Sequence, residues 1–160
     1  GDIHLPEEEI HTRSAVMVLA EGTSGHEAFM RVPMEIREDI LARVGTLVRN
    51  VAPIFLLCER SDIGISERLK DQYTGAASIY LYDSAPGGIG LSEGFADRWR
   101  EVFHAASDLV RQCSCSEGCP SCIGPVESSD GENRKHHTVE FLTSWIGTGE
   151  GVPGEQPDAR

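Results

Sequence analysis

Four of the five cysteines in this 160-residue chain are crowded into one short segment, residues 112–124, and this crowding constrains the fold more than any other feature. They follow the pattern C-x-C-x3-C-x2-C and are Cys113, Cys115, Cys119 and Cys122. A tetrahedral metal ion needs four soft ligands on a tightly turning piece of chain, and Gly118, Pro120 and Gly124 favour such turns. The spacing therefore predicts a loop closed around one zinc ion.

Two other partners for the thiols remain open at this point. Disulfides between cysteines so close in sequence would form very small, strained rings, and a reducing cytoplasm keeps thiols reduced. Four thiolates also hold [4Fe-4S] clusters, so an iron–sulfur cluster is the alternative cofactor to Zn2+. If the protein fills all four positions around zinc, none is left to activate water, and the predicted role of the ion is structural.

The composition is that of one ordinary globular domain, with 39% hydrophobic and 25% charged residues. We assign residues 1–146 to this domain and residues 147–160, rich in glycine and proline, to a disordered tail or linker. No apolar run reaches the roughly 20 residues of a membrane span, and the start lacks signal-peptide features. We therefore expect a soluble, cytoplasmic protein with no membrane partner. Because the chain starts without methionine, we also expect that it was cut from something longer.

The formal net charge of −12 bears on the partners of the chain. An acidic surface repels the phosphate backbone of nucleic acids, whose binding rests largely on lysine and arginine displacing counterions. We therefore expect weak DNA binding by the chain alone. An interdomain or protein–protein role suits such a surface better.

Hydrophobic periodicity indicates a mixed α+β fold, in which a small sheet is covered by three helices and a four-cysteine zinc loop is added. Strands are predicted at 15–20 and 78–82, and helices at 36–53, 91–110 and 137–146. Residues 54–58 suit either a last helical turn or another strand. The helix at 36–53 has an apolar stripe made by Ile36, Ile40, Leu41, Val44, Leu47, Val48 and Val51.

Two glycine-containing segments are possible structural or interface loops. Their notable residues are Cys58, Asp62, Gly64, Asp83, Pro86, Gly87, Gly88 and Gly90. The second segment, between a strand and a helix, favours a tight connection over a phosphate site, because it has no lysine and Asp83 would repel phosphate. If Asp62 met Asp83 the two would suit a cation or acid–base chemistry, but ordinary loop residues are favoured. For Cys58 a small buried hydrophobe is favoured over a fifth ligand, and His136 and His137 are read as surface or helix-start residues.

Three motifs in order, "CERSDIG", "IYLYDSAPGGIGLSEGF" and "CSCSEGCPSC", resemble the C-terminal MrfA-type zinc-binding domain of superfamily II DEAD/DEAH-box DNA helicases, the mitomycin repair factor A family. Together they span residues 58–123. Glu59 departs conservatively from the aspartate that is commoner in the family.

The resemblance implies that the four clustered cysteines are zinc ligands and that the parent protein is an ATP-dependent 3′–5′ DNA helicase of DNA repair. This chain has no phosphate-binding lysine loop, so it would be the non-catalytic accessory domain, with the helicase motor domains as partners and DNA reached through the parent. Two alternatives stay open. They are a subunit domain of a DISARM-type phage-defence protein and an iron–sulfur or redox module.

Overall fold

The computed structural model describes residues 13–127 and 133–147, and contains a three-stranded antiparallel sheet. Its strands are β1 (Ser14–Val18), β2 (Ile63–Arg68) and β3 (Ser78–Asp83), in the order β1-β3-β2. Apart from Gly147, the predicted tail at 147–160 lies outside the described residues, as do residues 1–12 at the other end.

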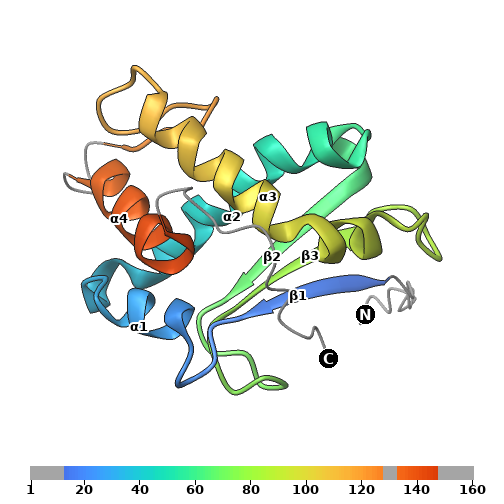
Figure 1. Ribbon diagram of the computed structural model, residues 1–160, viewed down its shortest axis with the longest axis horizontal. Coiled ribbons are helices and arrows are strands. Elements are labelled where there is room, and N and C mark those ends of the chain that lie inside the picture. The colour runs from blue at the N-terminus through green and yellow to red at the C-terminus, as the bar shows by residue number, and fades with distance from the viewer. Residues whose placement is uncertain (1–12, 128–132, 148–160) are drawn as a thin grey trace, which may run out of the picture.

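Four α-helices lie together on one side of this sheet (Figure 1). They are α1 (Ser24–Met30), α2 (Arg37–Leu56), α3 (Leu91–Gln112) and α4 (Arg134–Ile146), and short 3-10 turns precede α2 (Met34–Ile36) and β2 (Arg60–Asp62). This arrangement confirms the mixed fold with a small sheet under helices. None of the helices in the described part of the chain is both long and apolar enough to span a bilayer.

The long helix α2 has the predicted apolar stripe. All seven predicted stripe residues are buried, six of them in α2 and Ile36 in the 3-10 turn just before it. The helix does not end near Pro53, as the sequence predicted, but continues through it for one more turn to Leu56. It ends where Leu57 takes the left-handed conformation (φ 53°) and the N–H of Cys58 bonds the carbonyl of Pro53 at 3.2 Å. The ambiguous segment at 54–58 therefore begins as a last helical turn.

Two elements were not predicted from the sequence, the short helix α1 and the strand β2. Helix α1 has only seven residues, is capped by the Thr23 hydroxyl at 3.2 Å from the N–H of His26, and buries Phe29 against Phe141 of α4. Strand β2 contains Gly64, for which the sequence predicts a loop. A side chain there would meet the ring of Tyr82 at 2.1 Å. The aromatic neighbour on β3 thus explains a glycine inside a strand.

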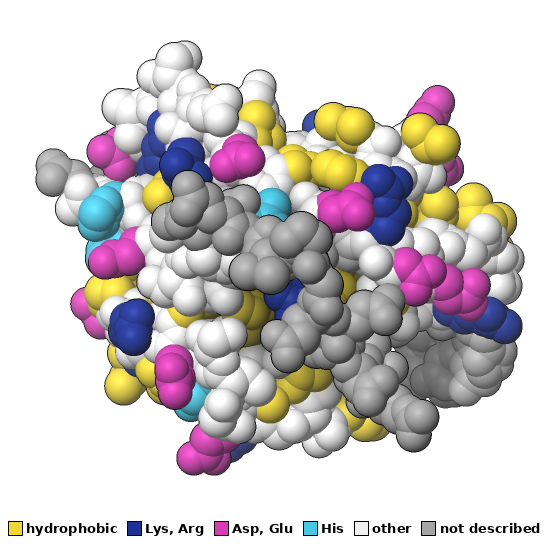
Figure 2. Space-filling view, viewed as in Figure 1, with side chains coloured by type: hydrophobic (Ala, Val, Ile, Leu, Met, Phe, Trp, Pro, Cys, Tyr) yellow, Lys and Arg dark blue, Asp and Glu magenta, His cyan; other side chains and the backbone are white. Residues whose placement is uncertain are grey.

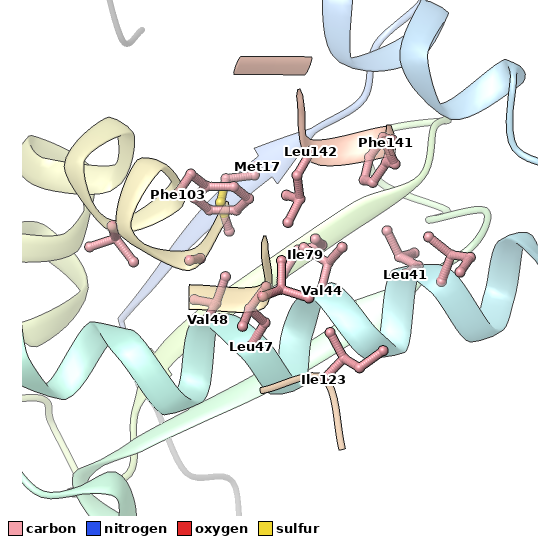
Figure 3. Close-up of a cluster of buried hydrophobic side chains, with 14 of the residues drawn as sticks. Met17, Leu41, Val44, Leu47, Val48, Ile79, Phe103, Ile123, Phe141 and Leu142 are labelled. Atoms are coloured by element: carbon pink, nitrogen blue, oxygen red, sulfur yellow. The ribbon is translucent and has the colours of Figure 1, made fainter. Parts of the chain in front are cut away.

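The core lies between the sheet and the helices, and Figure 3 shows side chains from β1, α2, β3, α3 and α4 converging there. From the sheet come Met17 and Ile79, and from the helices come Phe103 and Leu142. Ile123, from the thiol segment, also belongs to this cluster and is fully buried. The cysteine loop is therefore attached to the core and is not an independent appendage.

Candidate metal centre

The four clustered thiols converge on one point beyond the C-terminal end of α3. Their sulfur atoms all lie within 4.8 Å of one another. Sγ of Cys113 is 3.5 Å from that of Cys119, and Sγ of Cys122 is 3.6 Å from that of Cys115 and 3.7 Å from that of Cys119. Chain segments on both sides of a tight loop thus present sulfur to a common centre.

These separations suit a single tetrahedral ion. A disulfide places its sulfurs about 2.05 Å apart, far closer than any pair here. Zinc–sulfur bonds of about 2.3 Å arranged tetrahedrally place the sulfurs about 3.8 Å apart, near the three distances above. The donor set therefore fits one thiolate-bound metal ion without a large rearrangement.

Backbone turns bring the thiols together. The chain leaves α3 at Cys113, whose N–H bonds the carbonyl of Leu109 at 3.0 Å. The carbonyl of Cys119 accepts from the N–H of Cys122 at 3.0 Å and of Gly124 at 2.9 Å. Gly118 has φ 148°, and a side chain on it would lie 2.7 Å from the carbonyl of Gly124. Glycine is thus required where the loop folds back on itself.

Helix α2 holds the far side of the loop through its backbone carbonyls. Asn50 Nδ2 donates to the carbonyls of Pro120 at 3.1 Å and Cys122 at 2.8 Å. Arg43 Nη1 donates to the carbonyl of Pro125 at 2.6 Å. Together with the buried Ile123, these contacts place the second half of the loop against α2.

Helix α4 holds the first half of the loop. Lys135 Nζ donates to the carbonyls of Cys113 at 2.6 Å and Cys115 at 2.5 Å. In return, the Glu117 carboxylate accepts from the N–H of Asn133 at the start of α4, at 3.0 Å. The loop and the first turn of α4 are therefore bound to each other in both directions.

The thiols have different acidities before any metal is bound. Burial raises the pKa of Cys122 to about 12, and burial also raises the pKa of Cys115. Hydrogen bonds from the backbone N–H and the thiol of Cys115, followed by the thiol of Cys119, lower the pKa of Cys113 to about 7. Because a metal ligand must be a thiolate, metal binding has to displace the proton of the fully buried Cys122.

The glycine-rich turn at the N-terminal end of α3 is closed by a carboxylate and not by thiols. Asp83 Oδ2 accepts from the N–H groups of Ile89 at 2.6 Å, Gly90 at 3.0 Å and Leu91 at 3.3 Å, and Oδ1 accepts from Ser92 N–H at 2.8 Å. These are the amides that a phosphate at a helix N-terminus would use. The Asp83 carboxylate, 1% exposed, therefore occupies the anion position of this turn.

Burial by itself would raise the pKa of Asp83, but the four backbone N–H groups outweigh burial and hold its pKa below the usual range. Positive φ values at Gly87 (78°), Gly88 (73°) and Gly90 (90°) wrap the turn around this carboxylate, and Pro86 precedes them. The turn is thus closed by a side chain of its own protein.

Asp62, in the 3-10 turn before β2, lies close in space to the end of β3, since Ser84 N–H bonds the Asp62 carbonyl at 2.9 Å. The two carboxylates nevertheless bind different groups. Asp62 Oδ2 accepts from Glu59 N–H at 2.8 Å as part of a capping box, while Asp83 serves α3. Cys58 is half-buried, its pKa is raised first by burial and then by Asp62 and Asp83, and it is not in the sulfur cluster.

Within residues 13–127 and 133–147, no histidine belongs to the metal group. His136 and His137 lie in the first turn of α4, where His136 Nε2 is 3.7 Å from Glu140 Oε2. Asn50, Arg43 and Lys135, which hold the loop, were missed by sequence reasoning. Each contacts backbone carbonyls across 20 or more positions of the chain, and a single sequence carries no signal for such contacts.

The sequence and the fold are similar to those of known proteins. Residues 44–123, half of the chain, match the family described as the MrfA Zn-binding domain. The chain is 36% identical over 144 residues to a protein called uncharacterized ATP-dependent helicase YprA from Bacillus subtilis (strain 168), and the match covers 89% of this chain but 18% of that protein. It is also 30% identical over 98 residues to uncharacterized protein MJ1572.1 of Methanocaldococcus jannaschii, covering 59% of this chain and 81% of that protein.

Two solved structures are similar over almost the whole chain. One is the DUF1998 helicase MrfA bound to DNA, with a TM-score of 0.73 and 34% identity over 90% of this chain and 18% of that one. The other is MrfA bound to DNA and AMPPNP, with a TM-score of 0.68 and 32% identity over 89% of this chain and 17% of that one. The chain thus spans less than a fifth of these helicases, and by family match, fold and converged thiols it belongs to the MrfA zinc-binding domain family.

Proposed function

We propose that this chain is a non-catalytic zinc-binding accessory domain of an ATP-dependent DNA helicase, and that it supports the motor and the path of the DNA strand. The observation that carries the proposal is its likeness to one segment of DNA-bound MrfA, over 90% of this chain with a TM-score of 0.73. The proposed location is the cytoplasm, where thiols stay reduced.

The proposed ion is Zn2+, bound by all four clustered cysteines. In a [4Fe-4S] cluster each thiolate binds a different iron on the outside of a cube, so the sulfurs lie farther apart than around one ion. Sulfur atoms that all lie within 4.8 Å of one another favour the single ion. With four protein ligands, the ion has no open position, and its role is to hold the loop, Ile123 and α4 together.

Elemental analysis of protein purified under reducing conditions tests this assignment. We expect one zinc per chain and a colourless protein. Cys119→Ser should release the ion, whereas the matched control Cys58→Ser should keep it, because Cys58 lies outside the sulfur cluster. Brown protein containing iron and sulfide would support the iron–sulfur module instead, and a metal-free folded wild type would refute the zinc centre.

The isolated chain is proposed to hydrolyse no ATP. The turn before α3, which resembles a phosphate site, already holds the Asp83 carboxylate on the N–H groups that a phosphate would need. The sequence also lacks the G-x-x-x-x-G-K-[ST] loop of phosphate-binding ATPases. ATPase activity that co-purifies with the chain and is lost in Gly88→Ala would overturn this point.

Weak DNA binding is proposed for the isolated domain, because basic groups near the thiol loop are engaged within the protein. Arg111 pairs with Asp108 at 3.4 Å, Arg134 pairs with Asp39 at 2.7 Å, and Lys135 binds loop carbonyls. Figure 2 shows basic and acidic side chains interspersed on the face in view, with no continuous basic patch there. We expect a dissociation constant for single-stranded DNA of about 10⁻⁴ to 10⁻⁶ M at physiological salt.

Fluorescence anisotropy with labelled single-stranded DNA measures this affinity. Nanomolar, salt-sensitive binding by the isolated chain would replace the accessory role with a direct DNA clamp. In the parent helicase, the proposal predicts that Cys119→Ser impairs unwinding and repair while ATP binding persists, because the substitution disturbs this domain and not the motor.

A second candidate, a module that works without a motor on the same polypeptide, is favoured by one observation. The match to MJ1572.1 covers 81% of that protein, so a protein made mostly of this domain exists. A phage-defence subunit of the DISARM type would be one such case. The coding sequence around this domain decides between the two: helicase motor motifs in the same reading frame support the accessory role, and their absence supports the separate module.

A further inference from the structure

Lys135 has an unusual place beside the thiol loop. It is one of two lysines in the chain, the other being Lys70. Its side chain is partly buried, and its ammonium group lies 2.6 Å from the carbonyl of Cys113 and 2.5 Å from that of Cys115. It comes from α4, more than 20 positions beyond Cys113. A long, flexible side chain is therefore held in one conformation at the backbone of two clustered cysteines.

A cation at this place matters because of the charge of the centre. Four thiolates around a divalent ion carry a net charge of about −2, in a loop half-buried against the core. Glu117, the charged side chain of the loop itself, adds further negative charge and accepts from the N–H of Asn133. Arg43 binds the loop carbonyl at Pro125 and pairs with Asp39 at 3.4 Å, on the opposite side. Lys135 supplies positive charge on the side of Cys113 and Cys115.

We propose that Lys135 is a positioning residue for the metal centre, one that raises its affinity for zinc and makes the docking of the first turn of α4 depend on the bound ion. This inference rests on the zinc centre proposed above. Lys135 acts in two ways: its hydrogen bonds fix the backbone of Cys113 and Cys115, and its charge offsets part of the negative charge of the thiolates.

The coupling to α4 follows from how the two ends of that helix are held. The C-terminal half is fixed by packing: Phe141 meets Phe29 at 5.6 Å between ring centroids, and Trp145 meets Phe103 at 4.9 Å. In the first turn, Lys135 and the preceding Asn133 are bonded to the thiol loop, and Arg134 is paired with Asp39 of α2 at 2.7 Å, so only part of what holds this turn is independent of the loop. Loss of the ion should therefore free the first turn of α4 before it frees the second half.

The test compares zinc affinities of Lys135→Met, Lys135→Arg and the control Lys70→Met by competition with a chromogenic chelator. Substitution of outer groups that orient metal ligands typically weakens metal binding by about 10- to 100-fold, and we expect a loss in this range for Lys135→Met. Lys135→Arg keeps charge and donors and should stay within a few-fold of wild type. Lys70→Met removes an exposed lysine and should bind like wild type.

Two further readouts separate this role from a merely structural one. Added salt should reduce the difference in zinc affinity between wild type and Lys135→Met, because salt screens the charge of the lysine. Cobalt bound in place of zinc should give a tetrahedral thiolate spectrum in wild type and an altered one in the variant. Relative to wild type, amide hydrogen exchange in Lys135→Met should accelerate more at residues 134–138 than at residues 141–146.

Each outcome decides. Zinc affinity of Lys135→Met within twofold of wild type overturns the proposal, and so does an equal loss in Lys70→Met. If Lys135→Met does not fold, Lys135→Gln, which keeps a donor without charge, takes its place under the same criterion. A wild type that binds no zinc refutes the zinc centre itself, which is a distinct result from a wild type that binds zinc regardless of Lys135.

Discussion

Helix α3 has a glycine-containing loop at each of its two ends, and the two loops are closed in opposite ways. Before the helix, the turn at 84–90 wraps around the Asp83 carboxylate, which four backbone N–H groups bind. After the helix, the loop at 113–124 brings four thiols to one point. Figure 1 shows the two loops at opposite ends of α3.

The difference lies in where the closing group comes from. At the N-terminal end the chain carries its own anion, so the turn is complete on folding. At the C-terminal end the chain presents four thiols. They bind a metal ion only as thiolates, and the repulsion between four thiolates has to be offset by the bound cation. One end of α3 should therefore be independent of metal, and the other should depend on it.

Removal of the metal is the largest expected effect and the most direct way to break this comparison. Structural zinc is bound with about 10 kcal/mol or more of free energy in small domains, and part of it stabilises the fold. A strong chelator should therefore lower the melting temperature substantially. Amide exchange should accelerate at 113–126 and in the first turn of α4. Equal acceleration in the turn at 84–90 would show that the two ends are not independent.

Asp83→Asn is the reciprocal change and should have the next largest effect. An amide at this place turns a donor toward N–H groups, so buried backbone donors lose a charged acceptor. We expect the free energy of unfolding in urea to fall by about 3 kcal/mol. Zinc affinity should be unchanged. Asp62→Asn is the matched control, because its remaining amide oxygen can still accept the single Glu59 N–H, and an equal loss there would contradict the assignment.

Gly88→Ala should have a smaller effect on the same turn. A side chain at φ 73° is strained, and its Cβ would lie 2.9 Å from Asp83 Oδ2. Gly87 has a similar φ of 78° but nothing within 4 Å of an added Cβ. Gly88→Ala should therefore cost about 2 kcal/mol of unfolding free energy and Gly87→Ala about 1 kcal/mol. Equal losses would show that the contact with Asp83 contributes nothing beyond the backbone strain.

The smallest expected effect is the pH dependence of the stability that the Asp83 turn contributes, which changes only in acid. Because the folded pKa is below that of the unfolded state, about 3.9, its stabilisation is complete above that value and is lost as the pH falls through the folded pKa. Urea unfolding should therefore show the gap between wild type and Asp83→Asn constant from pH 7 to about 5 and shrinking below about 4. A gap that widens in acid would contradict the lowered pKa.

The parts of the fold that the sequence predicted correctly are those that a local pattern determines. The stripe from Ile36 to Val51 has the period of a helix, and all its predicted members are buried. Asn50 and Lys135 could not be predicted, because each finds its partners on distant backbone. Strand β2 was missed because Gly64 in a strand is unfavourable until the Tyr82 ring covers it. Pro53 does not end α2, although proline usually ends a helix, because it lies within the last turn.

By itself, the sequence determined the elements with a clear period and the tight spacing of four thiols, because helical stripes and ligand spacing are properties of short segments. Only the tertiary structure decided that Asp83 fills the anion site of its turn, since that required bringing the end of β3 against the start of α3. It also decided which side chains hold the thiol loop. Hydrogen bonds to backbone carbonyls depend on where the chain passes in space, and residue type alone does not specify that.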